Sequence, residues 1–521
     1  MAIRIPVPAS STIVSRLAAI VGPEGVSVSD LDRLHYSRDM YPGTLILQSE
    51  GVRESFPDVV VWPENTEQVQ QIVRFAAEQK MAVVPFGAGS GVCGGTTPVR
   101  GGIMLDMKRM SRVIEVNDDD LSVTAQPGIM GQNLENELER RGYTMGHFPS
   151  SIYCSTYGGW VATRSAGQLS SRYGKIEDMV LGCEFVTADG EIRRAPEAPG
   201  EALGPDWRQI MTGSEGTLGV LTEATCRIWP TPETRLFVAF TFPDVPAGVQ
   251  AMRLVMRHGL RPAAMRLYDP LDTMMVGTKG AEEETSGVGI MDYVPLDAIG
   301  TKLRAMAPKI FRRAQRAVNR WADVGNKLEG LARQGCLMVL MFEGSDRLTR
   351  FEFDQTIRFC ERLGGRNLGP EPALKWYRNR YHVSYKMIKV FYNQAFVDTI
   401  EVACSWDRVA RLYKDVRDAI KTKAFIMAHF SHAYPDGCSI YFTFVGSAMN
   451  PRAAHALHQE VWRDAMDVTV RTRGTISHHH GVGLSKAEFM PRELGDGVKL
   501  LRALKNAFDP DDVMNPGKLG L

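Results

Sequence analysis

The residues of this sequence that are best suited to proton chemistry stand together near its end, in RTRGTISHHHGVGLSK, residues 471–486. His478, His479 and His480 follow one another between a basic turn and a Gly-Val-Gly. Such imidazoles can bind a metal ion, move protons in catalysis, or lie solvated on a loop. If the stretch enters as a strand, alternation places His478 and His480 on one side and His479 on the other, so they cannot all serve one point. We expect the two glycines of the Gly-Val-Gly to let the chain turn behind the triplet.

A glycine-rich loop, PFGAGSGVCGG at residues 85–95, is the second candidate site, and it follows a strand–helix–strand pattern. The valines of 59–61 predict a strand, the apolar spacing after Asn65 or Thr66 predicts a helix, and MAVVPF predicts a second strand. Such a backbone can point several amides at one anion, although a plain loop has the same composition. A nicotinamide-type loop should open directly into a helix, but TTPVRGG follows here with Pro98, and the Lys-Ser/Thr of the Walker pattern is missing.

Further elements divide the chain into two regions of different character. Short strands are predicted within 101–107, 112–117, 121–128, 183–190 and 216–230, and a helix is predicted over 130–142. These elements indicate an α+β domain from about residue 50 to residue 232. Beyond it, long helical windows alternate with strands predicted at 336–344, 396–404 and 438–445, which indicates a sheet covered by helices. A final helix ends before Pro510.

The composition limits the classes of function. The chain has 521 residues, of which 44% are hydrophobic and 23% charged, and its formal net charge is +1. This length predicts about two to four structural domains. A chain without a basic excess is not expected to bind nucleic acid. We find no apolar run suited to a signal-peptide core or a membrane span, so we expect a cytoplasmic protein. The eight cysteines include no CxxC pair, which favours reduced thiols over a zinc ribbon.

Two later segments add meaning to the glycine loop: GHFPSSIYCSTYGGWVATRSAGQLSSRYGKIEDMV at 146–180 and GSEGTLGVLTEA at 213–224. In this order the three segments resemble the FAD-binding domain of the vanillyl-alcohol oxidase and p-cresol methylhydroxylase (PCMH) superfamily. Together with SHHHGVG, they are most similar to the alkyldihydroxyacetonephosphate synthases. The resemblance runs from about residue 50 to the end of the chain.

The resemblance implies an α+β fold in which a two-part PCMH-type FAD-binding domain faces an α+β cap domain with an antiparallel sheet covered by helices. We therefore expect an N-terminal helical segment at 1–50, the FAD-binding domain at 51–232 and the cap or substrate domain at 233–455. The C-terminal segment 456–521 carries the histidines and returns to the FAD domain. The active site is expected between the two domains.

Carried over position by position, the resemblance also implies which residues bind FAD. Contacts with the pyrophosphate are expected from Pro85, Phe86, Gly87, Ala88, Gly89, Ser90 and Gly91. Contacts with the flavin and diphosphate are expected from Ser150, Ser151, Ile152, Tyr153, Cys154, Ser155 and Thr156. The surface is completed by Thr163, Arg164, Ser165, Ala166, Glu215, Gly216, Thr217, Leu218, Gly219, Val220 and Leu221. At Ser150 the synthases have an aspartate, so that polar contact differs here.

The same resemblance bears on how the flavin is held. Some members of the superfamily tether it through a histidine in the first glycine loop, but this loop contains none. Others use a cysteine, and Cys154 does not align with that position when Gly158 and Gly159 are matched. We therefore expect FAD to be bound non-covalently.

The presence of a metal site can be judged by comparison with the related D-lactate and D-2-hydroxyglutarate dehydrogenases. These enzymes bind a divalent metal ion through a GHxGDGNxH hairpin and a Glu-His-Gly motif. In SHAYPDGCSIYF, residues 431–442, His432 is kept, but Ile440 occupies the place of the second histidine. In HHHG, His479 occupies the place of the glutamate, so the carboxylate that would orient a metal is absent. We therefore expect no metal.

The synthase resemblance also implies the catalytic residues. It gives acid/base and leaving-group roles to the histidine triplet and places Tyr441 as the catalytic phenol beside the flavin. Arg266 matches an arginine that the synthases need for activity, and His147 matches another active-site histidine. The residues alone also allow an ordinary structural role for each side chain. Tyr441 can be an aromatic residue in a core strand, which is the commoner case, and Arg266 can be a partner in a surface ion pair.

Two reactions follow from the resemblance. In the synthase reaction a base removes a proton from the first carbon of the substrate, flavin N5 bonds to that carbon as a carboxylate leaves, and a long-chain alcohol displaces the flavin. The more usual reaction of the superfamily is hydride transfer from a C–H bond to N5, assisted by a base. The phosphate-binding arginine of the synthases falls near Met387, where Lys386 or Lys389 is the available phosphate partner.

We therefore predict an FAD-dependent enzyme that acts through N5 on a small or lipidic hydroxy or keto substrate, as the synthases do. The alternative is an FAD-linked oxidase or dehydrogenase that transfers hydride from an alcohol, a phenol or a 2-hydroxy acid.

One basic segment, KLRAMAPKIFRRAQRAVNRW at 302–321, contains seven basic residues and no acid. After Pro308 its basic and apolar residues fall on opposite sides of a helix. This pattern predicts either a peripheral contact with anionic lipid or a lipid substrate, or an ordinary helix packed on the protein with its arginines solvated. We also expect the protein to be a homodimer.

Overall fold

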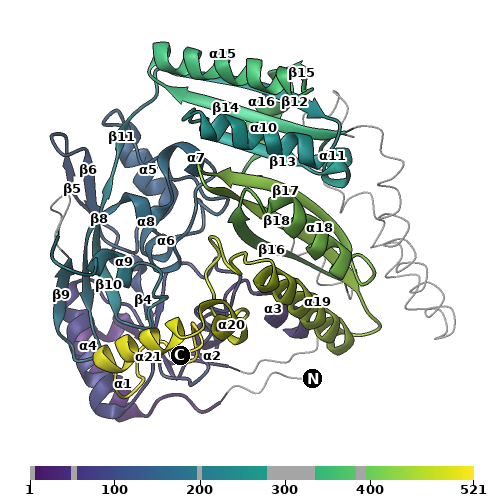
Figure 1. Cartoon of the computed structure of the whole chain (residues 1–521). Coiled ribbons are helices and arrows are strands. Elements are labelled where there is room, and N and C mark those ends of the chain that lie inside the picture. The colour runs from purple at the N-terminus through teal and green to yellow at the C-terminus, as the bar shows by residue number, and fades with distance from the viewer. Residues whose placement is uncertain (1–5, 49–54, 196–201, 278–334, 383–394) are drawn as a thin grey trace.

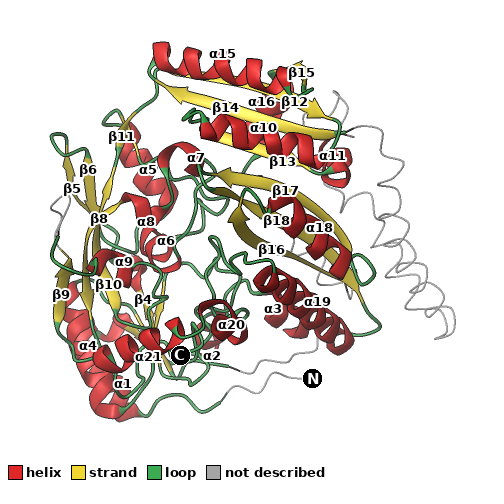
Figure 2. Ribbon diagram, viewed as in Figure 1, coloured by secondary structure: helices red, strands yellow, loops and turns green. Residues whose placement is uncertain are grey.

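The computed structural model describes residues 6–48, 55–195, 202–277, 335–382 and 395–521. Its helices and strands form two parts that lie side by side (Figure 1). The first part holds two small sheets and a two-stranded ribbon, and the second holds a single seven-stranded sheet (Figure 2). The α+β fold predicted from the sequence is confirmed.

The sheet that positions the glycine loop has the strand order β1–β2–β4–β3. Its strands are β1 (Val26–Ser27), β2 (Val59–Val61), β3 (Val83–Phe86) and β4 (Ile103–Asp106). β2 and β3 both run parallel to β4, and α4 (Thr66–Gln79) connects them, so the predicted strand–helix–strand unit is confirmed. Asn65 caps this helix by accepting the Gln68 N–H at 2.9 Å. β1 pairs with β2, so the N-terminal segment contributes a strand as well as helices.

A second sheet, with the order β5–β6–β10–β8–β9, completes the first part. Its strands are β5 (Val113–Asn117), β6 (Ser122–Ala125), β8 (Val180–Val186), β9 (Ile192–Ala195) and β10 (Val220–Arg227), and the ribbon is β7 (Tyr143–Thr144) with β11 (Trp229–Pro230). The other helices of this part are α1 (Ser11–Val21), α2 (Asp30–His35), α5 (Gly131–Glu139), α6 (Tyr157–Thr163), α7 (Ser170–Tyr173), α8 (Ile176–Met179) and α9 (Trp207–Met211), with 3-10 turns η1 (Pro23–Gly25) and η2 (Met107–Arg109). The N-terminal helix α3 (Pro42–Gln48) lies instead with the second part (Figure 1). The glycine loop continues through turns to β4 rather than into a helix, as predicted.

The second part, the cap, is built on an antiparallel sheet with the order β15–β12–β14–β13–β17–β18–β16. Its strands are β12 (Thr234–Phe242), β13 (Ala264–Tyr268), β14 (Cys336–Gly344), β15 (Arg366–Gly369), β16 (Ala395–Ser405), β17 (Phe425–Ala433) and β18 (Gly437–Ser447). Its helices are α10 (Val245–Arg257), α11 (Pro270–Gly277), α15 (Asp346–Arg362), α16 (Glu371–Asn379), α18 (Val409–Ile420) and α19 (Pro451–Arg471). The strands predicted at 336–344, 396–404 and 438–445 are confirmed.

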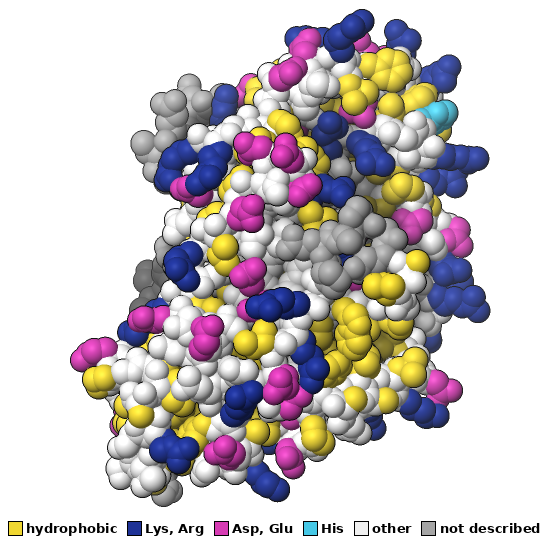
Figure 3. Space-filling view, turned by 90° about the vertical axis from the view of Figure 1, so that its left-hand side faces the viewer, with side chains coloured by type: hydrophobic (Ala, Val, Ile, Leu, Met, Phe, Trp, Pro, Cys, Tyr) yellow, Lys and Arg dark blue, Asp and Glu magenta, His cyan; other side chains and the backbone are white. Residues whose placement is uncertain are grey.

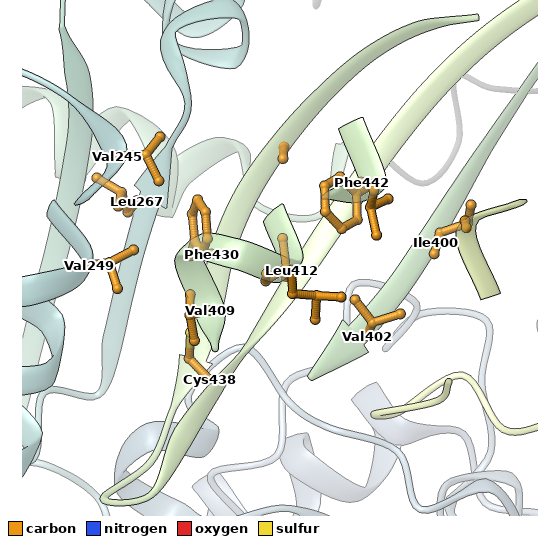
Figure 4. Close-up of a cluster of buried hydrophobic side chains, with 14 of the residues drawn as sticks. Val245, Val249, Leu267, Ile400, Val402, Val409, Leu412, Phe430, Cys438 and Phe442 are labelled. Atoms are coloured by element: carbon orange, nitrogen blue, oxygen red, sulfur yellow. The ribbon is translucent and has the colours of Figure 1, made fainter. Parts of the chain in front are cut away.

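The central strands of the cap sheet have two different faces, because successive side chains alternate in direction. On one face, Leu267, Phe430 and Phe442 are fully buried in the main hydrophobic core, together with Ile400. Figure 4 shows Leu412 of α18 lying against this face. Each such side chain contributes roughly 1.5–3 kcal/mol when it is buried. This apolar face fixes the sheet to its helices and leaves the opposite face to carry polar residues.

The C-terminal segment runs from the cap to the first part of the molecule. α19 packs on β16 and α3, and is followed by η5 (Ala487–Phe489), α20 (Met490–Leu494) and α21 (Gly497–Phe508). Near the chain end, Met514 forms a parallel bridge with Val83, and Asn515 N–H donates to Val83 O at 2.8 Å. The segment that holds the histidine triplet is therefore anchored on both parts.

The surface carries no strong bias of charge on the face drawn in Figure 3, where basic and acidic side chains are interspersed. This agrees with a formal net charge of +1. Within the described ranges, none of the helices combines the length and the apolar character that a membrane crossing requires.

Candidate active site

A row of polar and aromatic residues crosses four neighbouring strands of the cap sheet, on the face opposite to the hydrophobic core. Tyr268 of β13 pairs with His429 of β17, His429 pairs with Tyr441 of β18, and Tyr441 pairs with Glu401 of β16. Directly paired residues of antiparallel strands lie in contact on the same face. The rings of His429 and Tyr441 are stacked with their centroids 4.9 Å apart. The register of the sheet therefore places an imidazole, a phenol and a carboxylate side by side.

Arg266 joins this row from the same face of β13, two residues before Tyr268. Its guanidinium hydrogen-bonds to His429 Nε2, and His429 Nδ1 lies 3.2 Å from Asp272 Oδ2. Because arginine can only donate, Nε2 must accept, and Nδ1 carries the proton that is donated to Asp272. Burial holds the pKa of His429 well below its usual value, which keeps the ring neutral. Burial also raises the pKa of Asp272 to about 7, against the opposing charge of Arg266.

Glu401 binds the backbone of the histidine triplet. Its carboxylate accepts the N–H groups of His478, of His479 at 3.2 Å and of His480 at 3.1 Å. Lys486 Nζ donates to the same carboxylate at 2.5 Å, and both side chains of this pair are fully buried. Burial opposes the charge of Glu401, but the charge of Lys486 outweighs it, aided by His480, and the pKa of this carboxyl falls to about 2. Glu401 is therefore ionised at neutral pH.

The triplet does not enter as a strand, so the condition for alternation of its side chains is not met. Within residues 475–483, pairing is limited to a single bridge between Thr475 and Ala403, and the three histidines lie in bends. Their three N–H groups converge on one carboxylate, whereas an extended strand directs successive N–H groups to opposite edges. The rings gather as well: the centroids of His478 and His479 are 5.2 Å apart, and those of His479 and His480 are 4.5 Å apart. The inference from strand alternation, that the three histidine side chains cannot all face one point, therefore does not hold.

Tyr441 lies against two members of the triplet. Its ring is stacked on His479 at 6.2 Å and meets His480 edge-on at 5.6 Å, while its hydroxyl donates to Thr399 Oγ1 at 3.0 Å. Burial raises the pKa of Tyr441 to about 12. Burial also lowers the pKa of His479 and that of His480. At neutral pH a protonated phenol thus faces neutral imidazoles, an arrangement in which the phenol can donate and the imidazoles can accept.

The β17–β18 hairpin and α7 extend this array. His432 occupies a bulge in β17 with φ of +49°, and its ring lies 5.2 Å from that of His478 and 5.0 Å from that of His479. The Tyr434 hydroxyl lies 3.0 Å from His478 Nε2. Ser170 Oγ lies 2.7 Å from His432 Nδ1 and 3.3 Å from the Tyr434 hydroxyl. Burial lowers the pKa of His432, and lowers that of His478 to about 3, so both rings are neutral.

His147, the remaining predicted catalytic residue, contacts a different set of residues. Its Nε2 lies 2.8 Å from Ser165 Oγ, and its ring packs on Trp160 with centroids 4.7 Å apart. The side chain is fully buried, and this burial lowers its pKa to about 3. Its Nδ1 has no hydrogen-bond partner in the described part of the chain, so a polar atom is left over beside the predicted cofactor residue Ser165.

A second buried carboxylate, that of Glu215, holds the loop behind the triplet. Its Oε1 accepts the Val482 N–H at 2.5 Å, and its Oε2 accepts the Gly483 N–H at 2.8 Å. Gly481 and Gly483 have φ of +80° and +52°, and a Cβ on Gly483 would lie 2.2 Å from Cys93 O. The predicted turn is therefore confirmed. The carboxylate of Glu215, a predicted cofactor residue, is therefore occupied by the backbone of this loop.

The predicted FAD-binding segments meet in the structure. Gly87 of the glycine loop lies against Thr156 of the second segment, and a Cβ at Gly87 would be 2.2 Å from Thr156 Oγ1. Five of the predicted residues bury their side chains in hydrophobic cores, so only their backbones are free for a cofactor. These five are Phe86, Ile152, Leu218, Val220 and Leu221.

Buried polar atoms without a partner in the described part of the chain flank these segments in the sequence. They are Thr96 Oγ1, Thr97 Oγ1, His147 Nδ1 and Gln168 Oε1. Buried polar groups normally find a hydrogen-bond partner. A diphosphate or the polar edge of a flavin would provide one, and the glycine loop adds amides that an anion can approach closely. The residues present therefore fit FAD.

A carboxylate from another segment, that of Glu401, lies beside the histidines, although His479 occupies the place of the glutamate that holds a metal in the related dehydrogenases. Glu401, His478 and His479 offer atoms close enough together to share an ion. However, the oxygens of Glu401 already accept three backbone N–H groups and contact the ammonium of Lys486. That ammonium opposes a further cation at the same carboxylate. We assign no metal to this group.

Sequence reasoning missed several residues of the array. They are Ser170, Asp272, Glu401, His429, Tyr434 and Lys486. Glu401 had a detectable signal, because it is an acid within the largely apolar strand FVDTIEVAC. Lys386, predicted to bind substrate, and the basic segment 302–321 lie outside the described residues.

Comparison with known proteins identifies the family. The chain matches the FAD binding domain over residues 57–196 and the C-terminal domain of FAD linked oxidases over residues 231–519. The alkyldihydroxyacetonephosphate synthase of Dictyostelium discoideum is 30% identical, over 97% of this chain and 80% of its own length. The glycolate oxidase subunit GlcD of Bacillus subtilis (strain 168) is 27% identical, over 97% of this chain and 96% of its own length.

Two solved structures share the fold. An alkyldihydroxyacetonephosphate synthase has a TM-score of 0.77 at 26% identity and covers 99% of this chain with 88% of its own. p-Cresol methylhydroxylase, solved with substrate bound, has a TM-score of 0.74 at 16% identity and covers 99% of this chain with 98% of its own. The predicted superfamily, its PCMH-type fold and FAD as the cofactor are confirmed. The chain therefore belongs to the FAD-linked oxidases, and it is an FAD-dependent enzyme.

Proposed function

We propose that this enzyme acts through flavin N5 on a small or lipidic hydroxy or keto substrate, in the manner of the alkyldihydroxyacetonephosphate synthases. The observation that carries the proposal is the position of Tyr441. Its phenol is stacked on His429 on one side and borders His479 and His480 on the other. The synthase relative of 30% identity adds support.

FAD, when bound, supplies N5 as the electron-pair acceptor at the reacting carbon. The residues of this chain transfer protons and stabilise the charge that develops on the substrate. A neutral imidazole of His479 or His480 takes a proton from the substrate, and the Tyr441 hydroxyl donates to the substrate oxygen on which negative charge develops.

Arg266 suits an anionic group of the substrate, such as a carboxylate or phosphate. One of its N–H groups is committed to His429, which fixes the guanidinium plane. Its buried Nε has no partner within the described residues, so this donor is left for a ligand. A planar guanidinium can bind a carboxylate or phosphate through two parallel hydrogen bonds. We propose Lys386 as a further partner of a substrate phosphate.

A second candidate function is hydride transfer from an alcohol, a phenol or a 2-hydroxy acid to FAD. Met387 stands near the position of the phosphate-binding arginine of the synthases, which weakens the case for their substrate. The glycolate oxidase subunit GlcD is 27% identical over 97% of this chain. In this reaction the same histidines would take the hydroxyl proton.

Anaerobic incubation of the FAD-loaded enzyme separates the two reactions. With acyl-dihydroxyacetonephosphate and a long-chain alcohol, the proposal predicts an alkyl product and a released fatty acid, while the flavin is oxidised again after each turnover. With a panel of alcohols, phenols and 2-hydroxy acids, the second candidate predicts loss of the visible flavin absorption. Tyr441→Phe should slow whichever reaction occurs by about 100-fold or more.

Tyr413→Phe is the matched control for this substitution. Tyr413 lies on the core side of the same sheet, where its hydroxyl donates to Asp269 Oδ2 at 3.0 Å. Its loss should leave the rate within about threefold of the wild-type rate if only stability is affected. Bleaching by the panel without alkyl exchange would replace the proposal with the second candidate. Failure of the purified protein to take up FAD would contradict both.

We also propose a cytoplasmic homodimer in which segment 302–321 makes a peripheral contact with anionic lipid and guides a lipidic substrate. The run of seven basic residues without an acid supports this contact. The double charge reversal Arg312→Glu/Arg316→Glu should abolish binding to anionic liposomes, and unchanged binding would contradict the contact. Sedimentation of the wild-type protein tests the dimer.

A further inference from the structure

Arg266, His429 and Asp272 form a series of hydrogen bonds whose direction is fixed at both ends. The guanidinium of Arg266 hydrogen-bonds to His429 Nε2, and His429 Nδ1 lies 3.2 Å from Asp272 Oδ2. An arginine can only donate, and an ionised carboxylate can only accept. His429 therefore has one tautomer, with its proton on Nδ1, and both of its ring nitrogens are engaged. The ring connects the charge of Asp272 to that of Arg266 and has no nitrogen left for a ligand.

The position of Asp272 is fixed by the start of helix α11. Asp269 precedes this helix and accepts the Asp272 N–H at 2.8 Å, so it caps the first turn. Three donors hold the carboxylate of Asp269, each at 3.0 Å, and they are the Tyr413 hydroxyl, the Arg417 guanidinium and the Ala428 N–H. Asp272 differs, because its carboxylate forms no ion pair with a lysine or arginine of the described residues.

Arg266 also lacks a carboxylate of its own in the described part of the chain, and its buried Nε has no hydrogen-bond partner there. The nearest counter-charge known for it is that of Asp272, on the far side of a neutral imidazole. Arg266 lies close enough to Tyr441 to affect its ionisation: burial raises the pKa of Tyr441, and the charge of Arg266 opposes this rise. Arg266 is therefore a cation near the phenol, with a donor to spare.

An anion bound by Arg266 changes the charge balance of this series. Without a ligand, the charges of Arg266 and Asp272 cancel. With an anion bound, two negative charges accompany one positive charge in a place that little water reaches, since the side chain of Asp272 is 13% exposed. Such crowding favours the protonated form of a carboxylate. A ligand in direct contact with Arg266 keeps its charge, whereas Asp272 reaches Arg266 only through His429, so Asp272 is the group that gains the proton.

We propose that Asp272 is a positioning residue that gives up its negative charge when Arg266 binds a carboxylate or a phosphate. Asp272 takes up one proton from water, and an O–H bond forms there while no bond of the ligand breaks. The other oxygen of Asp272 still accepts the His429 N–H, so the guanidinium keeps its orientation. The ligand and the series together then carry no net charge. The site thus takes up an anion together with a proton, and a neutral analogue has no charge to replace that of Asp272.

This inference rests on the proposed function in one respect, the role of Arg266 in binding an anionic group of the substrate. It goes further by making the charge of the ligand part of its recognition. The binding of an anion without any turnover therefore tests it.

The titratable and charged groups around Asp272 come from α11 and from the three strands on which it packs, β13, β14 and β17. Among the described residues they are Arg266 and Tyr268 of β13, Cys336 of β14, His429 of β17 and Asp269. Burial raises the pKa of Tyr268 to about 12 and keeps His429 neutral. Burial also raises the pKa of both carboxylates to about 7, against the charge of an arginine in each case. A test has to distinguish these two carboxylates.

The pH dependence of anion affinity is the measurement. Below the pKa of Asp272, about 7, the free enzyme already carries the proton, so binding takes up none and the affinity is constant. Above it, binding needs a proton from water, and the association constant should fall by about fivefold or more between pH 7 and pH 9. Acetate and sulfate are the probes, because neither titrates in this range, and sulfate stands in for a phosphate. Nitrogen-15 signals of His429 in histidine-labelled, FAD-loaded enzyme report binding, and their loss in His429→Gln identifies them.

Asp272→Asn removes the charge and keeps an oxygen that can accept the His429 N–H. This variant should bind both probes with an affinity that does not depend on pH and that equals the affinity of the wild-type enzyme below about pH 7. Asp272→Glu should restore the dependence. Structural damage alone would not give tight, pH-independent binding. A wild-type affinity that is the same at pH 7 and pH 9 overturns the inference. A dependence that persists in Asp272→Asn also overturns it, since another group, such as Asp269, then takes the proton.

Thr273→Val is the matched control. Thr273 follows Asp272 in α11, and its hydroxyl donates to Tyr268 O at 3.2 Å and accepts the Leu337 N–H at 3.0 Å. Valine has a similar shape but makes neither bond, so the variant disturbs the same helix without changing a charge. It should keep the pH dependence of the wild-type enzyme. Loss of the dependence in this control would mean that any disturbance of α11 alters the site, and would overturn the role of Asp272.

Arg266→Gln separates this inference from the proposed function. It should abolish binding of both probes at every pH. Binding that survives in Arg266→Gln, or its absence from the wild-type enzyme, contradicts both the role of Arg266 and the inference. Binding that needs Arg266 but does not vary with pH overturns the inference alone. Binding that follows the predicted pH dependence in an enzyme that performs no alkyl exchange supports the inference and contradicts the proposed reaction alone.

Discussion

Glu401 carries a full negative charge at a place that water does not reach, and the shape of the histidine triplet depends on it. Its carboxylate accepts three consecutive backbone N–H groups and the ammonium of Lys486. A buried ion pair by itself contributes little, because taking both charges out of water offsets their attraction. Here the oxygens of Glu401 also accept the backbone N–H groups of the triplet, so the buried ion pair fixes the conformation of this loop. Removing one partner leaves the other charged and buried.

We predict that Glu401→Gln lowers the free energy of unfolding by about 3–5 kcal/mol at neutral pH, because Lys486 is left without its counter-charge. The double variant Glu401→Gln/Lys486→Met should recover part of this loss. The pKa of Glu401 lies near 2 in the folded protein, below its ordinary 4.5. Its stabilisation is therefore complete above pH 4.5 and is lost as the pH falls toward 2. Urea unfolding at a series of pH values measures both effects.

The control for this experiment is Asp418→Asn, which breaks exposed ion pairs with Lys414 and Lys421. Exposed pairs contribute less than about 1 kcal/mol, so this variant should unfold nearly as the wild type does. A Glu401→Gln protein as stable as the Asp418→Asn protein at neutral pH would show that Glu401 does not hold the loop.

At the scale of elements, the strands and helices were predictable because each depends on residues that are close in the sequence. The valines of β2, the Asn65 cap and the apolar stripe of α4 are local signals, and the structure follows them. The apolar positions of β16 and β18 predicted strands in the same way. The resemblance to the synthases added Tyr441 and Arg266, which periodicity alone treats as ordinary strand residues.

The site itself was less predictable, because its conformation is set by contacts between distant residues. The triplet bends since it meets Glu401, 77 residues earlier than His478, and no local pattern contains that contact. His432 reaches the triplet only because a bulge in β17 breaks the alternation on which strand prediction relies. Ser170 comes 262 residues before His432 in the chain. A pattern search could have singled out Glu401, but not its partners.

At the scale of the whole molecule, the loop 475–483 joins the two parts through one carboxylate from each. Glu401 of the cap holds the N–H groups of the triplet, and Glu215 of the first part holds those of Val482 and Gly483. Asn515 adds a link, because its side-chain amide donates to Gly95 O at 2.9 Å and to Glu215 O at 2.6 Å. The histidines of the triplet therefore have a fixed position only when both parts are folded and in contact.

This arrangement predicts that Glu215→Gln uncouples the unfolding of the two parts. A glutamine can accept only one of the two N–H groups, so one charge-assisted bond of about 1.5–3 kcal/mol is lost and the other is weakened. In the wild-type enzyme, release of FAD and loss of cap secondary structure should coincide in one thermal transition. In Glu215→Gln, FAD should be released at a lower temperature than the one at which the cap unfolds. Flavin fluorescence and circular dichroism, recorded on the same sample, report the two events.

Asp398→Asn separates uncoupling from simple destabilisation. Asp398 is a buried carboxylate within the cap, where His458 Nε2 and Trp462 Nε1 both lie 2.8 Å from its Oδ2. Its loss should lower the cap's stability by an amount similar to that expected for Glu215→Gln, yet it leaves the links to the first part intact. The two signals should then move to a lower temperature together. If they also coincide in Glu215→Gln, the two parts are held together by contacts other than this loop, and the position of the histidines does not depend on Glu215.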